Sequence, residues 1–146
     1  MKITADQYFA GYPDDAGITD EVRANADRLL AAVNSALELA EADGIVLETN
    51  AHEGAPHFGT LISGSKDGGW RPQSCPTGAP HSKHKLGLAV DLCDHNSALD
   101  PWSGGSAGQD QQLIDLNLAR EHPDATPNWC HWQLGAPPSG HWLFRP

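Results

Sequence analysis

A chain of 146 residues can bury one substantial hydrophobic core, so we expect a single domain over residues 1–146. The formal net charge of −10 and the lack of lysine and arginine clusters argue against nucleic acid as a partner. No stretch approaches the ~18 consecutive apolar residues of a membrane span, and the opening MKITADQYFAGYPDD lacks the apolar centre of a signal peptide. We therefore expect a monomer that is made in the cytoplasm and has no membrane partner.

An N-terminal arm, residues 1–17, precedes the strongest pattern in the chain, which predicts a long helix over residues 18–44. Thr19 or Asp20 can cap the start of this helix, and Gly44 ends it. The apolar residues at helical spacing are Val22, Leu29, Leu30, Val33 and Leu37. We interpret this stripe as core and the acidic outer face as solvated surface.

After Gly44 the sequence changes to short β-like segments separated by loops rich in glycine, proline and serine. A second, shorter helix is predicted over residues 109–121. The expected strands lie within residues 45–49, 59–63, 88–93, 129–133 and 141–144. The order of helix, strands, helix and strands predicts a small α+β domain with an antiparallel sheet, in which residues 45–146 carry the functional site.

The segment HSKHKLGLAVDLCD contains an unexpected carboxylate, because Asp91 interrupts an apolar β-like run. A buried carboxylate needs a partner or a metal ion. His84 lies seven residues before Asp91; on an unbroken strand this odd offset would place the two side chains on opposite faces. Gly87 can supply the bend that brings them together. We interpret His84 and Asp91 as a metal-ligand pair whose third partner comes from elsewhere in the chain.

His131 is the most informative of the other histidines, because strand alternation places Trp129, His131 and Gln133 on one face. From the residues alone it is either a ligand or a satisfied core histidine. The segment HEGAPH, residues 52–57, has one residue too many for a zinc-binding H-E-x-x-H helix and contains glycine and proline, so we reject it. Three further histidines are assigned to solvated loops or a helix end: His81, His95 and His122.

The segment SKHKLGLAVD, residues 82–91, resembles the S-x-H-x-x-G-x-A-x-D motif of the zinc D-alanyl-D-alanine peptidases, the LAS or hedgehog/DD-peptidase superfamily. Residues 122–146 are similar to the ending of phage-borne members, and WRP at residues 70–72 is similar to their Y-R-P stretch. The resemblance covers residues 50–146 and implies a hedgehog/DD-peptidase-like fold. The insertion SKDGG, residues 65–69, departs from the family pattern and leaves the substrate loop undefined.

This resemblance implies that His84, Asp91 and His131 bind one zinc ion. Two imidazoles and one carboxylate leave the fourth position open, as in catalytic rather than structural zinc sites. By the same resemblance, Arg71 orients a carboxylate or carbonyl of the peptide substrate, although a surface arginine in a loop is an equal alternative. Ser82 is expected to hydrogen-bond within the site and is not a nucleophile.

The general base is the main departure from the family. Several relatives carry a glutamate where this chain has Asn128, and others carry a histidine where it has Trp129. We expect Glu121 to replace them, with Asp124 and His141 as the next choices. His141 stands where phage-type members carry a basic residue, so it could also stabilise charge.

The implied substrate is a stem or cross-bridge peptide of bacterial peptidoglycan, cut by an endopeptidase or by a D,D- or L,D-carboxypeptidase. The phage-like ending favours a lysin or virion component that acts on the cell wall. The competing hypothesis is a zinc-holding binding or structural module that lost its base, and Asn128 favours it. Chemistry at Cys130 is the weakest alternative, because the only adjacent base is His131, which is already assigned as a ligand. We expect Cys75, Cys93 and Cys130 to be free thiols, and Cys93 to pack in the core.

Overall fold

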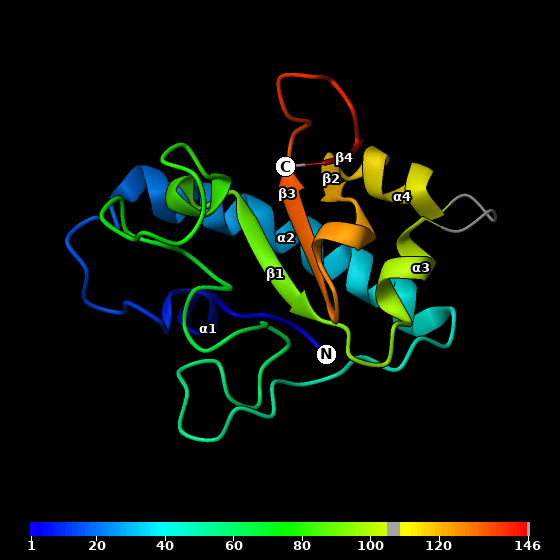
Figure 1. Ribbon diagram of the computed structural model, residues 1–146, viewed down its shortest axis with the longest axis horizontal. Helices are drawn as coiled ribbons and strands as arrows, with labels where there is room; N and C mark the ends of the chain where they lie inside the picture. Colours follow the sequence, from blue (N-terminus) through cyan, green and yellow to red (C-terminus); the bar gives the residue numbers. More distant parts are fainter. Residues whose placement is uncertain (105–108, 146) are drawn as a thin grey trace.

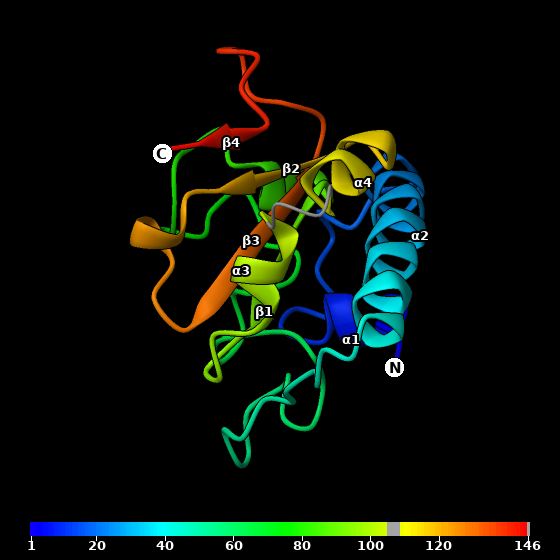
Figure 2. The ribbon, with the colours of Figure 1, turned by 90° about the vertical axis from the view of Figure 1, so that its right-hand side faces the viewer.

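The computed structural model describes residues 1–104 and 109–145 and shows a four-stranded sheet with one long helix along one face (Figures 1 and 2). The α+β class is therefore confirmed. In chain order the helices and strands are α1 (Ala5–Phe9), α2 (Asp20–Ala42), β1 (Ala89–Cys93), α3 (Leu99–Ser103), α4 (Gln109–Asp115), β2 (Leu118–Glu121), β3 (Trp129–Leu134) and β4 (Leu143–Phe144). Two short 3-10 helices, η1 (Lys83–Leu86) and η2 (Pro123–Ala125), precede β1 and β3. No described helix is both long enough and apolar enough to cross a membrane.

The long helix α2 forms where the sequence predicts it. The Thr19 hydroxyl accepts a hydrogen bond from the Val22 amide at 3.2 Å and caps the first turn. Gly44, with φ of 88°, follows its C-terminal end in the left-handed conformation that favours glycine. The predicted stripe is buried except at half-buried Val22. Each buried Leu or Val contributes roughly 1.5–3 kcal/mol to folding.

The sheet is mixed, so the prediction of an antiparallel sheet is wrong in part. Its strand order is β1-β3-β2-β4; β3 is antiparallel to both β1 and β2, whereas β4 runs parallel to β2. Backbone amides of β2 and of the residue after it bind the final segment, Arg120 to the Trp142 carbonyl at 2.8 Å and His122 to the Phe144 carbonyl at 2.7 Å. The loop between β3 and β4 is long enough to carry the chain past β2 to its outer edge, where β4 pairs parallel to β2.

Three further secondary-structure predictions are wrong. Residues 45–49 and 59–63 form no strand; Ile62 makes one isolated bridge to Leu92, and the Asn50 side chain binds the carbonyls of this loop instead. The predicted helix over residues 109–121 ends at Asp115, and residues 118–121 form β2. Asn117 interrupts the helix because it adopts a left-handed conformation, with φ of 61°.

The N-terminal arm is part of the packed structure. Its helix α1 presents Tyr8 and Phe9 to the core. The Tyr8 hydroxyl donates to the Ala89 carbonyl at 2.9 Å, and the Tyr8 carbonyl accepts from the Trp70 amide at 3.2 Å. These bonds attach the arm both to β1 and to the loop that precedes η1.

The two faces of β1 and β3 have different roles. Val90 and Leu92 of β1 and Cys130 and Trp132 of β3 belong to the hydrophobic core, which they share with α2. The alternate residues therefore point to the face of the sheet opposite α2 (Figure 2). Asp91 is among them, and its carboxylate is buried in a face where polar groups gather.

Candidate metal centre

Asp91 and His131 are direct neighbours across two antiparallel strands. The register of β1 and β3 pairs these two residues. The Asp91 Oδ1 atom lies 3.0 Å from His131 Nδ1, and both side chains are buried. Because strand pairing alone brings them together, this part of the site follows directly from the sheet register.

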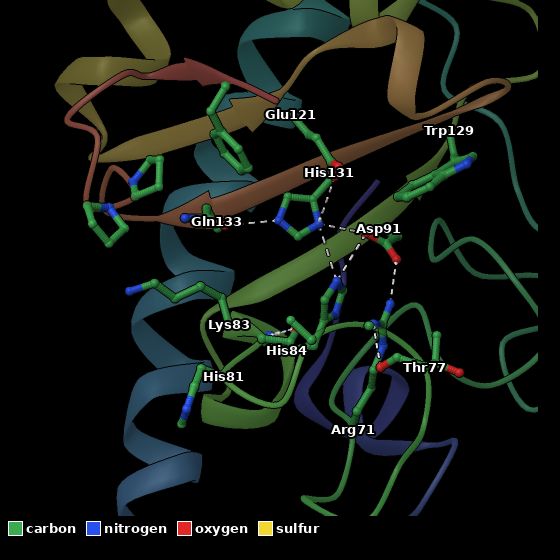
Figure 3. A pocket seen from close by; sticks show the side chains of 16 residues that line it. Arg71, Thr77, His81, Lys83, His84, Asp91, Glu121, Trp129, His131 and Gln133 are labelled. Atoms are coloured by element: carbon green, nitrogen blue, oxygen red, sulfur yellow. Dashed lines mark hydrogen bonds and ion pairs between the residues drawn. The ribbon is translucent and has the colours of Figure 1, made fainter. Parts of the chain in front are cut away.

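His84 reaches the same point from η1. Ser82 caps η1, its hydroxyl accepting from the His84 amide at 3.3 Å. Gly87 ends η1 with φ of 77°, and a side chain there would collide with the Val22 carbonyl of α2. The resulting bend places His84 Nε2 3.2 Å from Asp91 Oδ1 and 3.3 Å from His131 Nδ1 (Figure 3). The predicted bend at Gly87 is confirmed.

Hydrogen bonds behind the two imidazoles set their tautomers. His84 Nδ1 donates to the Gly69 carbonyl at 2.8 Å, because a carbonyl can only accept. His131 Nε2 donates to Gln133 Oε1 at 3.1 Å. The Gln133 amide nitrogen binds the Gly135 carbonyl at 3.1 Å, which fixes which end of the amide faces His131. Both neutral imidazoles therefore present an unprotonated nitrogen to Asp91.

When both imidazoles are neutral, three lone-pair donors face one another. Nitrogen and oxygen ligands about 2.0–2.1 Å from a tetrahedral zinc ion lie about 3.3 Å apart, close to the 3.0–3.3 Å separations of His84, Asp91 and His131. Hydrogen bonds from the second imidazole nitrogen to a carbonyl or amide oxygen are typical of metal-ligating histidines. These three residues could hold a metal ion.

Arg71 supports Asp91 rather than lying on the surface. Its Nη2 atom donates to Asp91 Oδ2 at 3.1 Å, on the oxygen that the histidines do not share. Nε and Nη1 donate to the carbonyls of Asp67 and Thr77, at 2.6 and 3.3 Å. Arg71 is 7% exposed, so the alternative of a surface arginine is wrong. Each guanidinium nitrogen makes a contact within the protein, and Arg71 thereby orients Asp91.

The charges of the site shift its pKa values in different directions. Burial raises the pKa of Asp91, but the two histidines outweigh burial and hold it well below its usual range. Burial lowers the pKa of His84. Burial has the same effect on His131, but the hydrogen bond and charge of Asp91 outweigh it and raise the pKa of this imidazole. Asp91 is therefore ionised at neutral pH and available as an anionic ligand.

Glu121 lies in the same row of the sheet. The register of β2 and β3 pairs Arg120 with Trp132, which places Glu121 beside His131. Glu121 Oε2 lies 3.9 Å from His131 Nδ1, and burial raises the pKa of this carboxyl group. Asp91, His131 and Glu121 thus stand side by side on three neighbouring strands (Figure 3).

His84, Asp91 and His131 line a cavity of about 460 Å³. Its apolar wall comes from Trp129, Phe144, Pro137 and Pro138. Its polar wall includes Glu121, Gln133, Arg71, His81, Ser82 and Lys83. A cavity of this size that combines apolar walls with a few convergent polar groups fits a short peptide or another small ligand.

Some residues singled out from the sequence lie elsewhere. His141 is exposed and lines a separate surface depression with His122. Asp124 is exposed and paired with Arg145 at 3.2 Å. Asn128 is also exposed, outside the cavity lining, with φ of 69°; its carbonyl accepts from the Asp94 amide at 3.0 Å. Asn128 is thus a turn residue, which explains an asparagine there.

The cysteines are free thiols, as expected. Cys93 lines a different depression from the ligand cavity and is buried, in agreement with packing. Cys130 points into the core, and burial together with Asp100 and Asp94 raises the pKa of its thiol well above the usual value. A thiol that stays protonated is a poor nucleophile, which weakens the alternative of cysteine chemistry.

A second group of metal-ligating types, Asp94, Asp100 and Cys130, lies on the core side of the sheet. Here the carboxylates already have donors. Asp94 accepts from the amides of Ala98, Leu99 and Asp100 at 2.8–3.0 Å, and Asp100 pairs with Arg120 at 3.4 Å. This group therefore holds the start of α3 in place.

No protein-family model, curated protein or solved structure was found to match the chain. The resemblance of residues 82–91 to the zinc D-alanyl-D-alanine peptidases therefore stays a prediction from the motif. The geometry of the site stands independently of that resemblance.

Sequence reasoning missed the supporting roles of Gly69 and Gln133. Gln133 carried a signal, since it stands two residues after His131 on a strand and must share its face. Gly69 carried none, because its contribution is a backbone carbonyl in the inserted segment, residues 65–69. A side chain at Gly69 would collide with the Tyr8 carbonyl, so glycine allows this close approach.

Proposed function

We propose that this chain is a zinc-dependent peptidase that hydrolyses a peptide bond in bacterial peptidoglycan. The observation that carries the proposal is the convergence of His84, Asp91 and His131, whose lone pairs face one another at the wall of an open cavity. Two nitrogens and one carboxylate oxygen suit zinc and leave a coordination position for water or substrate. Bound zinc supplies Lewis acidity, which polarises a peptide carbonyl and makes water easier to deprotonate.

Glu121 is the proposed general base. Among the carboxylates that line the cavity, Asp91 is taken up by the histidines and Arg71, which leaves Glu121 Oε2 to accept a proton from the attacking water. The same oxygen can then return the proton to the departing amine. The partial burial that raises the pKa of this carboxyl group also makes it a stronger base.

The remaining residues of the site position the ligands and the substrate. Arg71 orients Asp91, while Gly69 and Gln133 orient the two imidazoles. Trp129 and Phe144 offer an apolar surface to one side of a bound peptide. The choice of a D-amino-acid-containing cell-wall peptide rests on the motif in residues 82–91 and on the phage-like ending.

The proposal is tested by incubating the zinc-loaded protein with purified peptidoglycan and reading the soluble fragments by mass spectrometry, beside a chelator-treated sample. We expect new peptide ends that appear only without chelator, and their masses identify the bond that is cut. An absence of new ends, with one zinc bound per chain, would contradict the peptidase and favour a zinc-holding binding module. In such a module the same ligands would have a structural role.

A further inference from the structure

Lys83 is a cation without a protein partner in the wall of the proposed active site. It immediately precedes the ligand His84 on η1, lines the cavity and is half-buried. Within residues 1–104 and 109–145, no hydrogen bond or ion pair involves its ammonium group. Figure 3 shows the Lys83 side chain on the His84 side of the cavity, with Glu121 across the site. The ammonium is therefore available to a ligand in this cavity.

The lack of a partner among the described residues distinguishes Lys83 from the other lysines and arginines. The chain has nine lysines and arginines, all within the described residues, and eight of them have a partner there. Four make ion pairs: Lys2, Arg71, Arg120 and Arg145. Two bind a carbonyl or amide oxygen, Lys85 and Arg28, and two lie over aromatic rings, Lys66 and Arg23. In so acidic a protein, an unpaired cation in a cleft points to an anionic ligand.

The charge balance of the cavity supports the same conclusion. The charges of Arg71 and Lys83 offset those of Asp91 and Glu121. A divalent ion at the three ligands would then make the cavity positive, although the whole chain has a formal net charge of −10. The positive potential would be confined to the cleft, where it favours the binding of a negatively charged substrate.

We propose that Lys83 is a specificity-determining residue that binds a carboxylate of the peptide close to the bond that is cut. This inference rests on the proposed function, and it deepens it by naming an anionic peptide as the substrate. Arg71 is less suited to this task, because each of its guanidinium nitrogens already contacts Asp91 or a carbonyl oxygen. The compact ammonium of a lysine suits a single carboxylate, from either the peptide C-terminus or an acidic residue within it.

The test is a binding measurement on the zinc-loaded full chain carrying Glu121→Gln, which prevents turnover. Three probes are titrated by calorimetry: a synthetic stem pentapeptide ending in D-Ala-D-Ala, the same peptide with a C-terminal amide, and the same peptide with the α-carboxylate of its D-Glu amidated. We expect one of the two amidations to weaken binding by roughly tenfold, since a hydrogen bond to a charged group has about that effect. The amidation that does so identifies which carboxylate Lys83 contacts.

A second set of proteins assigns the effect to Lys83. Lys83→Met should bind the acid and the critical amide equally, whereas Lys83→Arg should restore their difference. Lys2→Met is the matched control, because Lys2 forms an exposed ion pair with Glu38 outside the cavity, and it should leave the difference unchanged. Zinc content should remain one ion per chain in every variant.

Two results would overturn the inference, and they differ. The role of Lys83 alone would be overturned if Lys83→Met still bound the acid more tightly than the amide. It would also be overturned if the protein with Lys83 intact bound all three peptides with equal affinity. No binding of any peptide to the zinc-loaded protein would overturn the substrate class, and with it the proposed function.

Discussion

Two groups of buried potential ligands lie on opposite sides of the sheet, and they differ in their hydrogen bonds. His84, Asp91 and His131 turn acceptor atoms toward one another, while their outer atoms are fixed by Gly69, Arg71 and Gln133. In the second group, the oxygens of Asp94 already accept three backbone amides. Both groups are buried, and in both the potential ligand atoms lie within 4.8 Å of one another, so the hydrogen bonds distinguish a candidate metal site from a structural cluster.

Removing a ligand should have the largest effect. We expect His84→Ala and His131→Ala each to lose stoichiometric zinc, because two remaining ligands hold the ion too weakly. His52→Ala is the control and should retain one zinc per chain, since His52 is exposed and outside the cavity. Elemental analysis after dialysis measures this, and zinc retained by both ligand variants would contradict the assignment.

Glu121→Gln should keep zinc but lower turnover of peptidoglycan by at least about a hundredfold, because an amide cannot accept the proton. Asp124→Asn is the comparison, since Asp124 is exposed and paired with Arg145, and it should leave turnover nearly unchanged. Initial rates of release of soluble fragments measure both variants. A wild-type rate in Glu121→Gln would assign the base to another residue.

Gln133→Met should weaken zinc binding by about 10–100-fold, because the His131 Nε2–H group loses its acceptor and the ring its fixed tautomer. Competition with a chromogenic chelator gives the affinity. Gln133→Glu keeps an acceptor and should bind zinc at least as tightly as the wild type. Equal affinities for all three proteins would show that the outer hydrogen bond does not support the ligand.

Asp94→Ala should affect stability and not zinc. Three buried or half-buried amides lose their acceptor, which costs about 1–3 kcal/mol of the free energy of unfolding. Urea unfolding measures the loss, and elemental analysis should still find one zinc per chain. A loss of zinc in Asp94→Ala would show that the second group also binds metal, and the contrast between the two groups would fail.

Asp100→Asn should leave zinc binding unchanged and alter only the pH dependence of stability. Burial, together with the charge of Asp94 and against that of Arg120, raises the pKa of Asp100 from 3.8 to about 6. The carboxyl group of Asp100 therefore binds a proton more tightly in the native state than in the unfolded chain. The stability that protonation adds is complete below pH 3.8 and is lost as the pH rises through 6. An asparagine side chain at this position cannot ionise, so urea unfolding between about pH 4 and 7 should show a flatter profile than the wild type. Parallel profiles for the two proteins would contradict the shift.

Local pattern predicted those elements whose stability depends on one buried stripe. Helix α2 has a capping threonine, apolar residues at helical spacing and a terminal glycine, and it forms as predicted. The alternation of Trp129, His131 and Gln133 likewise predicted their shared face, and all three line the cavity. Pattern failed at residues 109–121, where Asn117 adopts a left-handed conformation and the chain pairs as β2. That pairing depends on β3 and β4, which no local window contains.

The sequence by itself determined the α+β class, the long helix, the bend at Gly87 and the candidate ligand pair His84 and Asp91. These features depend on spacing of a few residues, which the order of the chain specifies. Only the tertiary structure decided the parallel pairing of β4, the attachment of Arg71 to Asp91, the support from Gly69 and Gln133, and the unpaired ammonium of Lys83. Hydrogen bonds between distant residues set these features, and their partners are chosen when the loops pack against the sheet.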